Sequence, residues 1–122
     1  MNWVVEFTST FRTWWEDLPE PEQIKIDAHT RLLERHGPRL PHPYSSGMLG
    51  ARTRHLRELR IQHKGRALRV FYAFDPRRRA ILLIGGDKTG DSRFYRRMIP
   101  LADMLYLSHL ADLEEKEPDD GC

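Results

Sequence analysis

Residues 56–61, with the sequence LRELRI, carry one glutamate and two arginines among apolar residues. Side chains of a β-strand point to opposite faces with a period of two, so Glu58 shares one face with Arg60, and Arg57 points to the other. Arg69, on the next predicted strand, adds a third positive group. Guanidinium groups held on a rigid sheet can present paired donors to a phosphate. For Glu58 the simpler interpretation is a structural ion pair that only orients the strand.

A glycine-rich turn, GGDKTG at residues 85–90, directly follows the last predicted strand. Glycines at a strand end let the backbone approach a ligand closely, and Lys88 would project from the strand end toward that ligand. The spacing is not that of a P-loop, so hydrolysis of a nucleotide triphosphate is not predicted. A plain turn is the alternative interpretation, and the nearby arginine-bearing strands favour a site.

The charged residues are unevenly distributed along the chain. Residues 50–100 hold 14 Lys and Arg against 4 Asp and Glu, whereas residues 101–122 hold 1 against 7. A long cationic block is typical of a surface that binds nucleic acid, here most simply RNA, and a solvated charged face is the alternative. The side chains expected to hold RNA are Arg52, Arg54, Arg57, Lys64, Arg77, Arg78, Arg79 and Arg93.

The elements that position these side chains are predicted from hydrophobic periodicity and turn residues. We expect a strand at residues 2–7, helices at 7–18 and 19–36, an irregular loop at 38–51, strands at 54–62, 66–75 and 80–86, and a final helix with Pro100 in its first turn. Trp14 and Trp15 fall on an apolar stripe, so at least one belongs to the core rather than to a base-stacking platform. The apolar face of the second helix is predicted at Ile24, Ala28 and Leu32.

The order strand, helix, helix, three strands, helix predicts the α+β class. Short connections imply antiparallel neighbours, so we expect a small antiparallel β-sheet with the helices packed on one face. The last helix would bury Ala102, Tyr106, Leu110 and Leu113. Residues 1–113 are predicted to form one domain, and residues 114–122 an acidic, disordered tail.

The cysteine and histidine residues limit which disulfides, metal sites and acid–base groups the protein can have. Cys122 is the only cysteine, which excludes an internal disulfide and suits a reducing cytoplasm. No apolar run is long enough to cross a membrane, and the N-terminus lacks a signal-peptide pattern. No histidine pair has metal-ligand spacing, so neither a metal site nor a cofactor is predicted. His55 and His63 could act as acid or base, whereas His29 and His36 are expected at the surface.

Three segments, LRELR at 56–60, RVFY at 69–72 and ILLIGGDK at 81–88, together resemble the signature strands of the RelE/HigB superfamily, with the HigB-like, phage-derived branch the most similar. These are the toxins of type II toxin–antitoxin modules, and the resemblance covers most of residues 1–113. It implies ribosome-dependent cleavage of mRNA and inhibition by a cognate, HigA-like antitoxin with a helix-turn-helix domain. The family's catalytic positions carry over to Arg60, Arg69, Lys88 and Tyr95. Many relatives read Gly-Phe-x-Lys-Lys-Thr after the last strand, whereas this chain lacks the aromatic residue and the second lysine.

The chemistry implied by the resemblance suits these residue types. In metal-free RNA cleavage the 2′-hydroxyl attacks the adjacent phosphate, so the protein must align the chain, stabilise charge and assist proton transfer. The arginines suit the charge, and Lys88 or Tyr95 could assist proton transfer; alternatively, Tyr95 could stack on a base or simply pack on the sheet. A non-enzymatic toxin that poisons DNA gyrase, as in the ParE relatives, is the alternative function on this scaffold.

Overall fold

The computed structural model describes residues 2–116 of the chain. The elements are β1 (Val5–Phe7), α1 (Ser9–Glu16), α2 (Glu20–His36), a 3₁₀ turn (Gly37–Arg39), β2 (Ser45–Gly47), β3 (Arg57–His63), β4 (Arg66–Phe74), β5 (Ala80–Asp87) and α3 (Phe94–Lys116). The predicted α+β class is confirmed. Residues 114–116 extend α3, so the prediction of a disordered tail is wrong there, and residues 117–122 lie outside the described residues.

The strands form one sheet in the order β1-β5-β4-β3-β2. Neighbours from β2 to β5 are antiparallel, as predicted, but β1 lies parallel to β5, with Val5 opposite Ala80. The prediction of a wholly antiparallel sheet is therefore wrong. The Pro- and Gly-rich segment contains a fifth strand, β2, which the sequence did not indicate because its order comes from pairing with β3.

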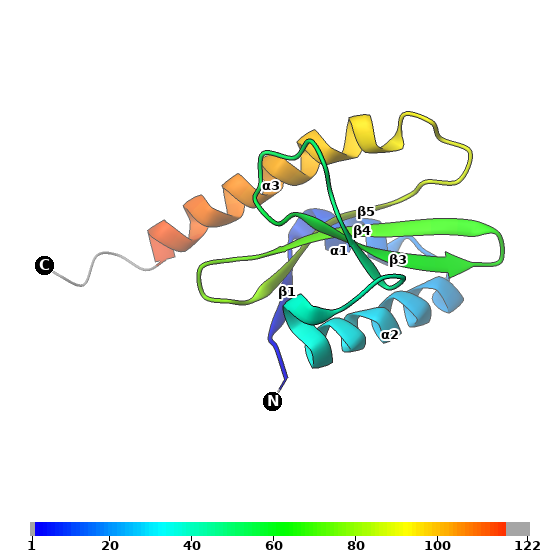
Figure 1. Cartoon of the computed structure of the whole chain (residues 1–122), viewed down its shortest axis with the longest axis horizontal. Helices are drawn as coiled ribbons and strands as arrows, with labels where there is room; N and C mark the ends of the chain where they lie inside the picture. The colour runs from blue at the N-terminus through cyan, green and yellow to red at the C-terminus, as the bar shows by residue number, and fades with distance from the viewer. Residues whose placement is uncertain (1, 117–122) are drawn as a thin grey trace, which may run out of the picture.

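Helices cover both faces of the sheet, which corrects the prediction that they lie on one face. Figure 1 shows α3 on one side of the strands and α2 on the other. One core cluster, with Phe11, Ile26 and Leu33, joins α1 and α2 to one sheet face. A second cluster, with Phe94 and Met98, joins α3 to the other face. The sequence of β4 is consistent with this arrangement. Its residues 67–73 contain only one charged side chain, as expected for a strand that is covered on both faces.

The helix faces follow the predictions only in part. Ala102 is buried in α3 as predicted, and both Trp14 and Trp15 pack against the core. In α2, however, the buried residues are Glu22, Ile26 and Leu33, whereas the predicted Ile24 is 60% exposed. Ala28 is exposed as well, and only Leu32 of the predicted stripe packs against the core. Periodicity cannot distinguish a buried acid such as Glu22, which pairs with Arg66 at 2.9 Å, from a surface acid.

The final helix begins earlier than predicted. It starts at Phe94, and Pro100 lies inside it rather than in the first turn. Proline lacks an N–H group, so Pro100 donates no hydrogen bond to the preceding turn. The early start places Phe94 and Tyr95 directly over the sheet. None of the helices within residues 2–116 is both long and apolar enough to cross a membrane.

The two glycines at the end of β5 have a packing role, which corrects the expectation that they admit a ligand. A Cβ atom on Gly85 would overlap the Trp14 ring on one face of the sheet. On the other face, a Cβ atom on Gly86 would lie 2.8 Å from Phe94 and 3.2 Å from Met98. Adjacent glycines thus seat an aromatic ring on each side of the same strand.

Candidate nucleic-acid site

A buried carboxylate, Glu58 on β3, organises a cluster on the α3 face of the sheet. Its side chain is 2% exposed, and its Oε2 atom lies 3.2 Å from Nη1 of Arg60. Its Oε1 atom lies 3.5 Å from Nε of Arg69 on β4. The hydroxyl of Tyr95 donates a 2.7 Å hydrogen bond to Oε1, and that of Ser46 on β2 donates a 2.8 Å bond to Oε2. One acid therefore fixes side chains from four elements.

The sheet register and the start of α3 bring these residues together. Arg60 is directly opposite Arg69, and Arg69 is opposite Gly86 on β5. Because Gly86 leaves room for Phe94, the Phe94 ring stacks on Phe71 at a centroid distance of 5.9 Å. This contact anchors the first turn of α3 and so places Tyr95 over Glu58.

Lys88 joins the same cluster from the end of β5. Its backbone N–H donates a 2.8 Å hydrogen bond to the carbonyl of Ala67, which continues the pairing with β4. Its ammonium group lies 5.3 Å from the centre of the Tyr95 ring, within the range of a cation–π contact. The four residues predicted as catalytic are therefore gathered at one place.

The cluster carries more positive than negative charge. It holds two guanidinium groups and, beside the Tyr95 ring, the ammonium group of Lys88, against the single carboxylate of Glu58. Arg69 is the most constrained: its side chain is 6% exposed, and its Nη1 donates to the carbonyl of Leu68 at 3.0 Å. Its Nε faces Oε1 of Glu58 at 3.5 Å without the geometry of a hydrogen bond, and it has no other acceptor among the described residues. A cluster with three cationic groups and one carboxylate favours the binding of an anion.

Tyr95 is held as a neutral phenol. Burial raises the pKa of Tyr95, and its hydrogen bond to the Glu58 carboxylate raises it further, which together outweigh the lowering effect of Arg69. A raised pKa keeps the proton on the hydroxyl at neutral pH. The structure therefore supports Tyr95 as a hydrogen-bond donor or an aromatic surface, and it does not support a proton-accepting role.

Arg57 lies on the opposite face from this cluster, as its alternation with Glu58 predicts. Its Nε donates a 2.9 Å hydrogen bond to the hydroxyl of Ser45, and that hydroxyl lies 2.6 Å from the hydroxyl of the buried Tyr72. Its role in RNA binding stays a prediction, and it is separate from the Glu58 cluster.

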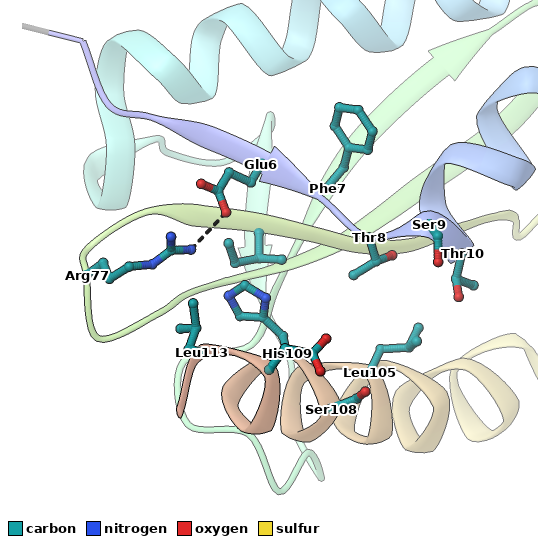
Figure 2. A pocket seen from close by; sticks show the side chains of 12 residues that line it. Glu6, Phe7, Thr8, Ser9, Thr10, Arg77, Leu105, Ser108, His109 and Leu113 are labelled. Atoms are coloured by element: carbon teal, nitrogen blue, oxygen red, sulfur yellow. Dashed lines mark hydrogen bonds and ion pairs between the residues drawn. The ribbon is translucent and has the colours of Figure 1, made fainter. Parts of the chain in front are cut away.

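The arginines of the β4–β5 turn also lie elsewhere. Arg77 pairs with Asp75 at 2.6 Å and with Glu6 at 2.8 Å, and Arg79 pairs with Glu6 at 2.7 Å. Figure 2 shows Arg77 joined to Glu6 of β1, with His109 of α3 beside them. Arg78 instead lies 5.3 Å from the centre of the Trp3 ring. The guanidinium groups of Arg77 and Arg79 are thus engaged by acids of the chain itself.

A buried acid anchors this second network. Burial would raise the pKa of Asp75, but hydrogen bonds from His109 and Arg77 outweigh burial and hold the pKa below its usual range. Nε2 of His109 lies 2.9 Å from Oδ2 of Asp75. The network ties the β4–β5 turn to α3 and β1, which indicates a structural role.

The remaining cationic residues predicted to hold RNA are exposed. These are Arg52, Arg54, Lys64 and Arg93. The loop that carries Arg52 is tied to α3, because the backbone N–H groups of Arg52 and Thr53 each donate a 2.8 Å hydrogen bond to Asp103. Their contact with RNA stays a prediction.

Sequence reasoning missed a hollow of about 310 Å³ beside the cluster, at the edge of β3. It is lined by Arg60 and Arg69 together with Lys25, His29, Pro43, Tyr44 and Gln62. His29 was expected at the surface, and the hollow that it lines is shared with two predicted catalytic residues. Only the packing of α2 and the 41–44 loop against β3 brings these residues together, so no local signal could have found them. Across residues 2–116, no group of three or more His, Cys, Asp and Glu side chains is arranged to hold a metal ion.

The fold and this cluster define a small α+β protein with a cationic, partly buried site on its sheet. Residues 13–107 match the family described as phage derived protein Gp49-like (DUF891), and the chain belongs to this family. It is 35% identical over 107 residues to a Mycobacterium tuberculosis protein named "Putative toxin HigB2", and 37% identical over 99 residues to one named "Putative toxin HigB3". These matches confirm the HigB-like resemblance.

The matches cover 86% and 80% of this chain respectively. They cover 85% of the HigB3 protein but 53% of HigB2, so the chain spans about half the length of that relative. No solved structure matches the chain.

Proposed function

We propose that this protein is the toxin of a type II toxin–antitoxin system and acts as an endoribonuclease that cuts mRNA on the ribosome. The observation that carries the proposal is the gathering of Arg60, Arg69 and Tyr95 around Glu58, with Lys88 against the Tyr95 ring, in a chain of this family. The relatives' names support the toxin role. Cleavage rests on the site.

Each side chain has a role that its geometry suits. In the proposed reaction the RNA 2′-hydroxyl gives its proton to a solvent water and attacks phosphorus, and a 2′,3′-cyclic phosphate forms as the bond to the 5′-oxygen breaks. Negative charge accumulates on the phosphate oxygens during this step. Arg69 and Arg60, which lie opposite each other on neighbouring strands, would stabilise that charge. Lys88, as an ammonium, can donate a proton to the departing 5′-oxygen. Tyr95, whose single O–H is donated to Glu58, would pack its ring against a base.

Glu58 would act as a positioning residue rather than a catalytic one. It holds Arg60, Arg69 and Tyr95 on the same side of the sheet before RNA arrives, which lowers the cost of arranging them during the reaction. Its carboxylate has partners on both oxygens and is almost fully buried.

The proposed partners follow from the same family resemblance. They are a cognate, HigA-like antitoxin with a helix-turn-helix domain, and the ribosome with its mRNA, in the cytoplasm. The exposed cations Arg52, Arg54, Lys64 and Arg93 would hold RNA backbone phosphates away from the scissile bond.

The test is cleavage of a defined mRNA on purified translating ribosomes, read by primer extension. We expect the wild-type protein to produce new 5′ ends, and Arg69→Ala and Lys88→Ala to abolish them. Arg31→Ala is the matched control, because Arg31 is an exposed cation on α2 outside the cluster. Cutting by both site variants at the wild-type rate would overturn the site, and intact mRNA with broken DNA would favour the gyrase-poisoning alternative.

A further inference from the structure

The hollow at the edge of β3 has the chemistry of a nucleotide-binding subsite. Its lining contains three cationic side chains, those of Lys25, Arg60 and Arg69, and no carboxylate. Its volume, about 310 Å³, is at the lower end of ligand pockets and suits one nucleotide rather than a folded partner. A site that is cationic, free of acids and small favours a compact anion.

The cations of the hollow are fixed in place. Lys25 donates a 2.5 Å hydrogen bond from Nζ to the carbonyl of Gln62, an edge group of β3 beyond the end of β2. Arg69 is 6% exposed, and its Nε faces Oε1 of Glu58 at 3.5 Å. The hollow is therefore lined by cations whose positions are set before a phosphate arrives.

An aromatic ring lies beside these cations. Tyr44 is 43% exposed, and its ring meets that of His29 edge-on, with centroids 6.2 Å apart and planes at 61°. The Tyr44 carbonyl accepts a 2.9 Å hydrogen bond from the backbone N–H of Arg60, which links the ring to the candidate catalytic strand. Proteins that bind single-stranded nucleic acid stack unpaired bases on exposed aromatic rings that lie next to cationic side chains.

His29 offers a polar group at the same place. Its Nδ1 lies 2.9 Å from the carbonyl of Lys25, and because a carbonyl only accepts, Nδ1 carries the hydrogen. In the neutral ring Nε2 is then an acceptor, able to receive a hydrogen bond from an amino group of a base.

From these contacts we infer that the hollow binds the nucleotide next to the scissile phosphate. Tyr44 would stack on its base, His29 would contact the edge of the base, and Lys25 would bind its phosphate. The inference rests on the proposed function, since it takes Arg60 and Arg69 as the groups at the scissile phosphate. It adds three residues from α2 and the proline-rich loop, and it makes Tyr44 and His29 determinants of the cleavage preference.

The test is binding of a labelled single-stranded hexaribonucleotide with 2′-O-methyl groups, which cannot be cleaved, measured by fluorescence anisotropy with the full chain. We expect Tyr44→Ala to weaken binding by about tenfold, as for loss of one base–aromatic stack, and Tyr44→Phe to bind within twofold of wild type. Lys25→Gln should reduce the slope of log affinity against log salt by about 0.7, the value for one phosphate of a single strand. Arg31→Gln removes the same charge from the exposed face of α2 and should leave the slope unchanged.

Two outcomes would overturn the subsite: wild-type affinity in Tyr44→Ala, or equal losses in Tyr44→Ala and Tyr44→Phe, which would assign the effect to the hydroxyl. Thermal unfolding of each variant separates loss of binding from loss of the fold. Because the oligonucleotide cannot be cut, the result does not depend on catalysis. Tyr44-dependent binding without ribosomal cleavage by the wild type would retain the subsite and refute the nuclease.

Discussion

Replacing Glu58 by alanine should destabilise the protein strongly, because the substitution leaves a buried cation without its counter-charge. The side chain of Arg69 is 6% exposed and that of Glu58 is 2% exposed. Water therefore cannot take the place of the lost carboxylate beside Arg69. Removing one partner of a buried ion pair costs about 3–5 kcal/mol. Arg60 is 31% exposed and its loss of the same partner adds little. We therefore expect the free energy of unfolding to fall by about 3–5 kcal/mol.

The assay is urea unfolding followed by tryptophan fluorescence, with two matched variants. Glu16→Ala removes an acid from an exposed ion pair, in which the side chain of Glu16 is 55% exposed and that of Arg12 is 65% exposed. This substitution should change the free energy of unfolding by less than about 0.5 kcal/mol. The double variant Glu58→Ala/Arg69→Met removes the buried charge as well, so it should be more stable than Glu58→Ala alone. If Glu58→Ala costs no more than Glu16→Ala, the carboxylate does not organise the cluster.

Gly85→Ala should destabilise the fold by about 1–3 kcal/mol because its Cβ overlaps the Trp14 ring, whereas Gly47→Ala meets nothing nearer than Arg57 at 3.5 Å and should be nearly neutral in the same unfolding assay. The lowered pKa of Asp75 in the folded state means that its stabilisation is complete above the unfolded-state pKa and is lost as pH falls through the folded-state pKa. Asp75→Asn should therefore flatten the loss of stability below about pH 4, and an unchanged acid limb would refute the assignment. Tyr95→Phe keeps the ring beside Lys88 but loses the hydrogen bond to Glu58. If ribosomal cleavage is retained in Tyr95→Phe and lost in Tyr95→Ala, the role belongs to the ring. Equal loss of cleavage in both variants would assign the role to the hydroxyl.

The adjacency of the central cluster could be predicted because it depends on local rules. The period of two puts Glu58 and Arg60 on one face, and the short turn between β3 and β4 places Arg69 opposite Arg60. Lys88 and Tyr95 were included through the family resemblance, since nothing in their local pattern shows that α3 begins over Gly86.

The features missed from the sequence depend on long-range packing. The pair Gly85 and Gly86 predicts a ligand-binding turn, but in the structure the absence of their side chains makes room for the rings of Trp14 and Phe94. Both rings come from other elements, so the local sequence does not show this packing. Ser46 and Tyr44 lie in a segment broken by proline and glycine, and their order comes from pairing with β3. The parallel placement of β1 likewise depends on which sheet edge is free.

The central claim is that the cluster around Glu58 cuts RNA, and the most direct measurement is mapping of transcript 5′ ends in cells after induced expression. The informative variant is Lys88→Ala, because Lys88 makes no contact with Glu58 in the structure and its loss leaves the buried ion pairs intact. We predict new 5′ ends within coding regions for the wild type, none for Lys88→Ala at equal protein level, and intact chromosomal DNA in both. Growth arrest by the wild type with unchanged transcript ends would contradict the account.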